Sequence, residues 1–300
     1  LSLKKENFYM VENTVDGKFF VTARGWEDLS EILKSYEELQ VEIGEELIGE
    51  FLQKEEIARD FAGYYRLYEK YKSDYQIQEI LDGNVTSRQL KTCCDMGKKA
   101  SFEERFAVTE MLLEAVTERI SVFQKIDEKT EKLYGNLKLL KVFLQEKNSV
   151  EAMEQFIVSR RKALDAKICS ELLTAEEAAR EEEQIRILEE YFFQLKELHI
   201  SDVAEGIEQI GERFGNVCRL RNEKLEETKK MLEQAFSFLE ECFGEGQELL
   251  LFETGLTGDD RCSIFISQYG CPSYFKHCEL LLYSKKENEL RKECRDLLEE

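Results

Sequence analysis

The sequence has few of the residues that make turns and few that serve as acid–base catalysts near neutral pH. A single proline and 16 glycines among 300 residues are too few for the many turns of an all-β fold. Two histidines, His199 and His277, leave few candidates for a histidine-dependent active site. No stretch approaches the roughly 20 apolar residues that a membrane-spanning helix requires. We therefore expect a helical protein without a membrane span.

Short motifs that mark common active sites are also missing. The sequence has no GxxxxGK[ST] phosphate loop and no GxGxxG dinucleotide fingerprint. It has neither the HExxH pair of zinc proteases nor the GxSxG turn of serine hydrolases. Taken alone, the chain offers no complete catalytic site.

Basic residues are fewer than acidic residues in this sequence. Lysine and arginine number 42 against 63 aspartates and glutamates, which gives a net charge of −21. Such a surface repels nucleic-acid phosphates and anionic lipids, so neither is an expected partner. The hydrophobic content of 42% is enough to fill a core and argues against a disordered acidic tail. A protein is the partner that this charge favours.

The cysteines lack the regular spacing of a disulfide framework. They number nine, and free thiols in a reducing cytosol account for them best, so a cytoplasmic location is expected. Four residues near the C-terminus have atoms that can bind zinc: Cys262, Cys271, His277 and Cys278. Their spacings miss the paired CxxC knuckle of zinc sites, so buried thiols without a metal are expected there.

Residues 8–22 give the clearest β signal in the sequence. Asp16-Gly17 favours a two-residue type I′ turn, because both turn positions need positive φ. A small hairpin attached to a helical domain is therefore predicted. The turn predicts three cross-strand pairs: Val11 with Thr22, Glu12 with Val21, and Thr14 with Phe19.

Apolar residues recur at helical spacing through most of the remaining chain. Thr22 is an acceptable N-cap for a first helix, whose buried face is predicted from Trp26, Leu29, Leu33 and Tyr36. A later stretch steps by 4-3-4-3, which is typical of a coiled-coil seam, and we expect it to pack in an antiparallel arrangement within the chain. The residues of this seam are Val203, Ile207, Ile210, Phe214 and Val217.

Shifts in composition predict four segments in a mainly α fold. The first is a helical domain at residues 1–85 that includes the hairpin. A linker or short helix at 86–101 leads to an elongated antiparallel bundle of long helices at 102–243. A helical cap occupies residues 244–300.

Arg24 is the residue that most suggests a binding role. It lies in the first turn of a predicted helix, where the helix dipole favours anions and disfavours a cation. A basic side chain suits this position if a phosphate binds both the helix end and the guanidinium. The alternative is an ordinary surface arginine that pairs with Glu27 or Asp28.

Two segments resemble one protein family. Residues 8–30, FYMVENTVDGKFFVTARGWEDLS, resemble the region that follows the ATPase core in MoxR-type AAA+ ATPases, in a branch found in anaerobic Firmicutes. Residues 267–283, SQYGCPSYFKHCELLLY, resemble the C-terminal end of the same proteins. The TARGWEDL motif is the distinctive part, and the helical middle of the chain is compatible with the family without being specific to it.

The resemblance implies that residues 1–85 form an AAA+ lid. Arg24 would then be the sensor 2 arginine, which reaches the γ-phosphate of ATP, while Trp26 and Leu29 would pack the lid helix. ATP and Mg²⁺ would bind to the parent protein and not to this chain alone. The Walker A lysine, the Walker B acid, sensor 1 and the arginine finger would belong to a core that precedes Leu1, so hydrolysis by this chain alone is not expected.

The resemblance also implies a partner and an assembly. The parent ATPase would be hexameric, whereas the present chain would be monomeric or weakly associated. The helical extension would transmit ATP-driven movement to a protein with a von Willebrand factor A-type domain, in chaperone-like remodelling. The alternative that stays open is a nucleotide-independent acidic helical scaffold or adaptor for protein–protein interaction.

Overall fold

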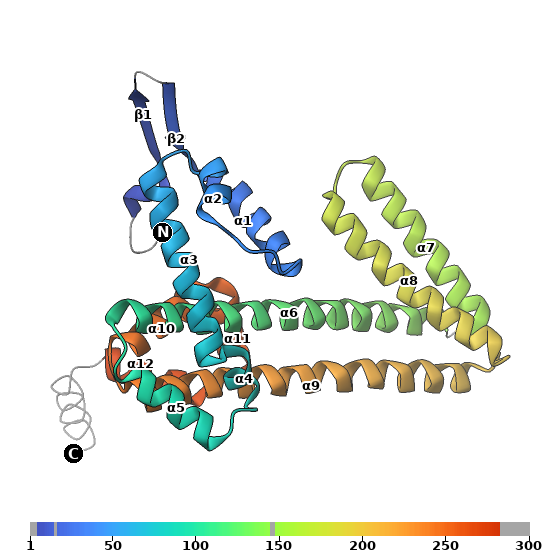
Figure 1. The fold of residues 1–300 in the computed structure, drawn as a ribbon. Coiled ribbons are helices and arrows are strands. Elements are labelled where there is room, and N and C mark those ends of the chain that lie inside the picture. Colours follow the sequence, from blue (N-terminus) through green and yellow to red (C-terminus); the bar gives the residue numbers. More distant parts are fainter. Residues whose placement is uncertain (1–4, 15–16, 145–147, 283–300) are drawn as a thin grey trace, which may run out of the picture. The chain divides into compact units, whose positions relative to one another are not determined.

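The computed structural model describes residues 5–14, 17–144 and 148–282, and most of them are helical (Figure 1). The predicted class, mainly α with one small β-hairpin, is confirmed. The elements are η1 (Lys5–Phe8), β1 (Met10–Thr14), β2 (Gly17–Val21), α1 (Ala23–Glu38), α2 (Glu45–Phe51), α3 (Glu55–Tyr75), α4 (Ile77–Asp82), α5 (Ser87–Gly97), α6 (Phe102–Phe143), α7 (Ser149–Cys169), α8 (Ala175–Glu197), α9 (Val203–Phe243), α10 (Gln247–Gly258), α11 (Asp260–Tyr269) and α12 (Pro272–Leu282).

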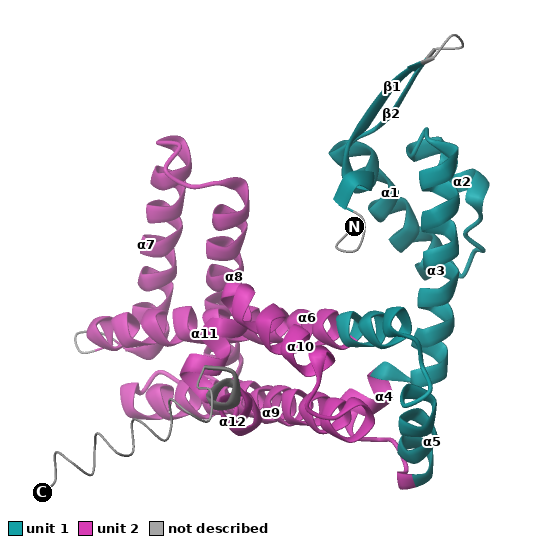
Figure 2. Cartoon of the chain, turned by 90° about the vertical axis from the view of Figure 1, so that its left-hand side faces the viewer, with its two compact units in different colours: residues 1–77, 88–111 teal, residues 78–87, 112–300 magenta. Residues whose placement is uncertain are grey.

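The chain divides into two compact units (Figure 2). Unit 1 comprises residues 1–77 and 88–111, and unit 2 comprises residues 78–87 and 112–300. These units do not coincide with the four segments expected from composition, whose boundaries stay predictions. Helix α5 occupies most of the segment expected to be a linker or short helix. Helix α6 begins in unit 1 and continues through unit 2.

The hairpin forms, but the predicted register is wrong. Val11 pairs with Phe20 and Glu12 pairs with Phe19, and the innermost pair is Thr14 with Gly17. The observed register sets Met10 opposite Val21, and both side chains pack against the core of unit 1. The predicted register would have placed the carboxylate of Glu12 opposite Val21. Burial of an apolar pair on the helix side therefore accounts for the observed register.

The core of unit 1 lies between α1, α2, α3 and the base of the hairpin. Thr22 caps α1 as predicted, since its Oγ1 accepts a hydrogen bond from the Gly25 amide at 3.2 Å. A Cβ on Gly25 would lie 2.9 Å from the carbonyl oxygen of Phe51, so glycine allows the start of α1 to approach the end of α2. The buried residues of this core are Val21, Leu29, Leu33, Ile48, Leu52, Ile57, Ala58 and Ala62.

The two longest helices, α6 and α9, run antiparallel to each other within unit 2. They have 42 and 41 residues, so each is about 60 Å long at 1.5 Å per residue. Tyr134 of α6 stacks on Phe214 of α9, and Asp127 of α6 pairs with Arg221 of α9. The residue numbers rise along one helix as they fall along the other, which fixes the antiparallel direction.

Helices α7 and α8 form a second antiparallel pair that packs against α6 and α9 of the same unit (Figure 1). Thr174 begins α8 with a capping box, in which its side chain and that of Glu177 bond each other's backbone amides. The shared core includes Leu140 of α6, Phe156 of α7 and Leu188 of α8. Four of the five predicted seam residues of α9 pack against it, whereas Ile207 is exposed.

Helices α10, α11 and α12 follow a sharp turn at the end of α9. Gly244, with φ of 75°, ends α9 in a backbone conformation that glycine adopts without strain. Phe236 of α9 meets Phe252 of α10 with ring centroids 5.2 Å apart, so α10 returns along α9. The predicted cap at 244–300 contains these three helices, and its residues 283–300 lie outside the described residues.

Candidate functional site

Arg24 lies in the first turn of α1, as predicted, and its side chain is 86% exposed. No acidic residue occupies that turn. The guanidinium Nε lies 3.7 Å from Oδ2 of Asp28, one helical turn later, which is the pairing expected of a surface arginine. Exposed ion pairs of this kind contribute little to the stability of the fold. The guanidinium therefore stays available to an anion. The sensor 2 role of Arg24 stays a prediction.

The residues that follow Arg24 anchor the start of α1. Trp26 donates a hydrogen bond from Nε1 to the carbonyl oxygen of Asn7 at 3.1 Å. Its ring meets Phe61 of α3 edge to face, with centroids 5.1 Å apart. Leu29 is buried in the core of unit 1. The packing roles expected of Trp26 and Leu29 are confirmed, and they hold Arg24 on a fixed helix end.

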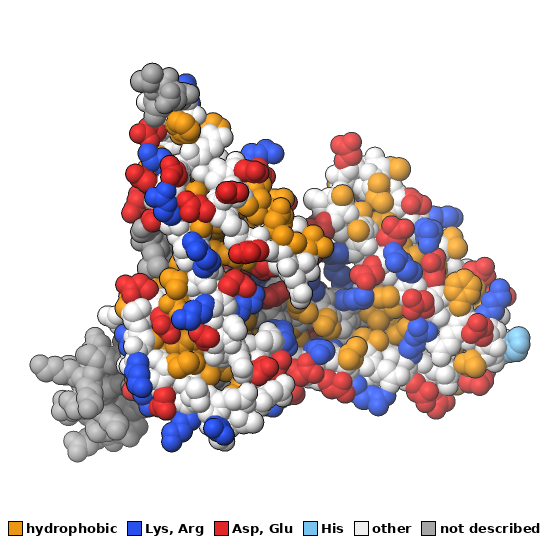
Figure 3. All heavy atoms as spheres, viewed as in Figure 1, with side chains coloured by type: hydrophobic (Ala, Val, Ile, Leu, Met, Phe, Trp, Pro, Cys, Tyr) orange, Lys and Arg blue, Asp and Glu red, His pale blue; other side chains and the backbone are white. Residues whose placement is uncertain are grey.

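One face of the hairpin packs on helices at its base, through Met10 and Val21, and the other face lies in solvent. Val11 and Phe20 are cross-strand neighbours on the solvent face, and they are 50% and 44% exposed. Tyr9, just before β1, is 65% exposed. We call Tyr9, Val11 and Phe20 the hairpin face. Hydrophobic side chains are visible at the surface of this region in Figure 3, among acidic and basic ones. Exposed apolar groups that lie together commonly mark an interaction site.

The zinc-capable residues near the C-terminus turn toward different partners. Cys262 Sγ lies 3.5 Å from Oγ1 of Thr117, and Cys271 Sγ donates to Oε1 of Glu233 at 3.3 Å. Both cysteines are buried free thiols, as predicted, and burial raises their pKa values to about 11 and about 12. The side chain of Cys278 lies outside the described residues. Among the described residues, no group of three or more His, Cys, Asp or Glu is placed to hold a metal.

The expectation of free thiols holds for only part of the chain. Among the described residues, five cysteines are free: Cys93, Cys169, Cys218, Cys262 and Cys271. For Cys94 and Cys242 the expectation is wrong, since each is disulfide-bonded.

A buried carboxyl group lies between α9, α10 and α12. Glu253 of α10 is 1% exposed, and neither of its carboxyl oxygens has a hydrogen-bond partner. One turn along α10, Thr257 shares a hydrogen bond of 2.8 Å with the Tyr274 hydroxyl of α12. Helix α12 runs antiparallel to α10. His277, about one turn after Tyr274, therefore lies beside Glu253, one turn before Thr257. Burial raises the pKa of Glu253. The electrostatic effect of His277 acts to lower that pKa but is smaller than the effect of burial.

His277 is itself buried and paired. It is 2% exposed, stacks on Phe236 of α9, and bonds Oε1 of Glu240 through its Nε2. Lys276 reaches the same oxygen of Glu240 at 3.2 Å. Burial acts to raise the pKa of Glu240, but the bonds from His277 and Lys276 outweigh it and lower that pKa. The histidine thus links α12 to α9, which is a packing role.

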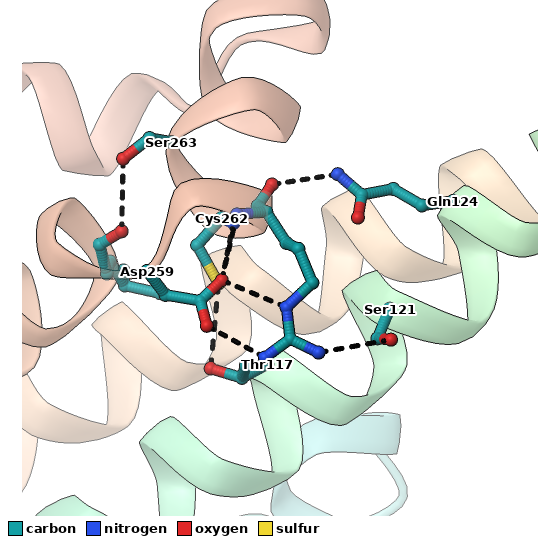
Figure 4. A network of polar contacts seen from close by, with 8 residues as sticks. Thr117, Ser121, Gln124, Asp259, Cys262 and Ser263 are labelled. Atoms are coloured by element: carbon teal, nitrogen blue, oxygen red, sulfur yellow. Dashed lines mark hydrogen bonds and ion pairs between the residues drawn. The ribbon is translucent and has the colours of Figure 1, made fainter.

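A further polar network joins α11 to α6 (Figure 4). Asp259 caps α11 by accepting bonds from the amides of Arg261 and Cys262 at 2.9 and 3.1 Å. Its carboxylate pairs with the Arg261 guanidinium at 2.8 Å, and this pairing lowers the pKa of Asp259. Arg261 also reaches Ser121, and Gln124 donates to the Arg261 carbonyl at 2.9 Å. Every group here serves capping or helix contact.

Sequence reasoning missed the two features that stand out. The hairpin face was not distinguished from the packed face, although alternation along both strands predicts two faces. Glu253 was not singled out, although it is the one acid within the apolar stretch Leu249–Leu256. An isolated charge in such a run is the available signal for a buried carboxyl group.

Comparison with protein-family models, with curated proteins and with solved structures gives no match. The resemblance to MoxR-type ATPases therefore depends only on the residues quoted above. Among the described residues, no helix is long and apolar enough to cross a membrane.

Proposed function

We propose that this chain is a nucleotide-independent helical adaptor that binds another protein through its hairpin. The hairpin face carries this proposal: Tyr9, Val11 and Phe20 expose apolar surface together on a small sheet. The opposite face of the same sheet is fixed to the core of unit 1 through Met10 and Val21. A rigidly based apolar surface is what a protein-binding element requires.

The charge of the chain supports a protein as the partner. A net charge of −21 opposes binding to nucleic acid or to an anionic membrane. The described residues include no group arranged for metal binding, and the polar clusters of unit 2 serve helix caps and helix contacts. Binding, rather than catalysis by this chain, is the function that its geometry favours.

The test is quantitative affinity capture from the source cell with three forms of the chain. The first is the wild type, and the second carries Val11→Ser with Phe20→Ser. The matched control carries Leu172→Ser, which removes an even more exposed apolar side chain between α7 and α8. A partner retained by wild type and control but lost from the hairpin variant supports the proposal. Equal capture by all three forms refutes it.

A second candidate is the lid and helical extension of a MoxR-like AAA+ ATPase. One observation favours it: Arg24 exposes a guanidinium in the first turn of a well-anchored helix. In this reading Arg24 senses the phosphate of ATP held with Mg²⁺ by a preceding core in a hexameric cytoplasmic parent. The extension then moves a partner, such as a von Willebrand factor A-type protein, in chaperone-like remodelling.

Two measurements test the lid. The intact mass of the native polypeptide should exceed that of this chain by an AAA+ core of roughly 200 residues. In that longer protein, Arg24→Ala should abolish or greatly reduce ATP turnover, while Lys34→Ala on the same helix should leave it unchanged. A native mass near 35.2 kDa, or full turnover with Arg24→Ala, removes the lid proposal.

A further inference from the structure

One side of the seam between α6 and α9 is exposed to solvent. Tyr134 of α6 stacks on Phe214 of α9 with ring centroids 5.9 Å apart, yet Tyr134 is 56% exposed. Lys141 and Ile207 each lie seven residues from that pair, which is about two turns along the antiparallel helices. They therefore lie at one level of the seam, and Ile207 is 40% exposed. The seam is thus accessible to solvent over about two helical turns.

Helices α7 and α8 cover the other side of this seam. Arg213 of α9 bonds the Glu190 carboxylate of α8 at 3.0 Å, and Leu133 of α6 is buried in the core shared with both helices. Ile207 lies six residues before Arg213, which is about 120° around α9. Val142 lies nine residues after Leu133, on the opposite side of α6, and is 63% exposed. Ile207 and Val142 therefore point away from α7 and α8.

Two glycines lie on this exposed side. Gly135 is two turns before Val142 on α6, and Gly211 is one turn after Ile207 on α9. A Cβ on either glycine would meet no heavy atom within 4 Å beyond its own stretch of helix. Without side chains at these positions, the backbone of another helix can approach closely. We call the following residues the open face: Tyr134, Gly135, Val142, Ile207 and Gly211.

The α6 side of the open face is basic. In a chain with a net charge of −21, residues 132 to 144 include no acidic residue and three lysines: Lys132, Lys138 and Lys141. Lys138 lies one turn after Tyr134 and one turn before Val142, and it is exposed. Within the described part of the chain, neither Lys138 nor Lys141 forms an ion pair. Glu131, one turn before Gly135, limits the positive charge to the part of α6 that follows it.

The acidic residues of α9 at this level do not neutralise those lysines. Glu205 and Glu212 lie nine and two residues before Phe214, so they are on the opposite side of α9. Glu208 lies about 100° around α9 from Ile207, at the outer edge of the open face. The edge formed by α6 therefore favours an acidic partner, and the edge formed by α9 does not.

We propose that the open face binds an amphipathic helix of another protein, with acidic residues along the edge that lies on α6. The apolar stripe of that helix would cover the exposed tyrosine, valine and isoleucine, as in other cases where a helix docks on an apolar surface. Its carboxylates would pair with Lys138 and Lys141. This surface belongs to unit 2 and does not depend on the hairpin, so it gives the proposed adaptor a second binding surface.

The probe is a fluorescent synthetic peptide of three heptads, with leucine at positions a and d and glutamate at position e. One control peptide carries lysine in place of glutamate, and a second has the composition of the probe in scrambled order. Titration against the full chain, followed by fluorescence anisotropy, gives the Kd of each. We expect the glutamate peptide to bind at least about tenfold more tightly than both controls, and added salt to weaken its binding. Equal binding of the glutamate and lysine peptides overturns the inference.

Charge variants of the chain test the basic edge. Lys138→Glu with Lys141→Glu should weaken the glutamate peptide by at least about tenfold. The matched control is Lys162→Glu with Lys167→Glu, which changes the net charge equally at exposed positions of α7. The control should bind the peptide as wild type does. Equal losses in both variants would mean that only the net charge matters, and this would refute a site on α6.

Apolar variants separate helix docking from simple charge attraction. Val142→Ser with Ile207→Ser should weaken the peptide, whereas Leu172→Ser should not, and circular dichroism checks that each variant is folded. Unchanged binding to the first variant overturns the inference. So does binding of the chain to vesicles of phosphatidylcholine and phosphatidylserine without peptide binding, which would indicate a membrane surface. Val11→Ser with Phe20→Ser should leave peptide binding unchanged, so this test and that of the hairpin can fail separately.

Discussion

Glu253 provides a sharp test of the packing between α9, α10 and α12. Its carboxyl group is buried without a hydrogen-bond partner, and burial raises its pKa above the ordinary 4.5. The unfolded chain therefore loses this proton at a lower pH than the folded chain does. As the pH rises from about 4.5 through the folded-state pKa, Glu253 lowers the stability of the fold, and above that pKa the loss is complete.

The perturbation is Glu253→Met, which keeps the length of an unbranched side chain and removes the charge. An unsatisfied buried polar group costs about 1–3 kcal/mol. We therefore expect the variant to be more stable than wild type by about that amount at pH 8. For a unit of this size, each kcal/mol corresponds to about 2–4 °C in Tm. The difference should shrink as the pH falls, because protonation of Glu253 in the folded wild type removes the buried charge.

The assay is chemical and thermal unfolding from pH 5 to pH 8, followed by circular dichroism. Glu253→Gln is the matched control, because it removes ionisation while leaving a buried polar group. Its stability should lack the extra pH dependence of wild type but should stay below that of Glu253→Met. Parallel pH profiles for all three proteins would refute the reasoning. A less stable Glu253→Met at pH 8 would instead mean that attraction to His277 outweighs the cost of burial.

Other predictions concern glycines of α9 and the reactivity of thiols. A Cβ on Gly206 would lie 2.6 Å from Cβ of buried Ser149, so Gly206→Ala should lower stability by about 1–3 kcal/mol. Gly211 has open space around it, so Gly211→Ala should raise stability by up to about 1 kcal/mol, and urea unfolding of both variants checks the contrast. Iodoacetamide should label exposed Cys169 long before buried Cys262, as mass spectrometry would show; equal labelling would contradict the burial.

The helical class was predictable because short-range patterns determine it. Thr22 caps α1 because the amide that its side chain accepts from is only three residues away. The seam of α9 could be read from periodicity, but Ile207 shows that a periodic position need not be covered by a neighbouring helix. Local signals thus predict where helices begin and which face tends to be apolar.

Features that depend on distant residues could not be predicted in the same way. The hairpin register follows from which strand residues meet the helical core, and the turn dipeptide alone gave the wrong pairs. The isolation of Glu253 requires knowledge of α9 and α12, which flank it after folding. For Arg24 the position in the first turn was predictable, whereas its sensor 2 role stays a prediction.

The two ends of the α7–α8 pair meet. The Ser149 amide donates to the carbonyl oxygen of Ser201 at 3.2 Å, and its hydroxyl donates to the carbonyl oxygen of Ile200 at 2.7 Å. The first and last residues of this segment of about 50 residues therefore lie side by side, which is the geometry of an inserted segment. The pair could be excised or exchanged with a short splice between α6 and α9. Such a splice would uncover the apolar side chains of Leu133 and Leu140, so any replacement must supply a matching apolar surface.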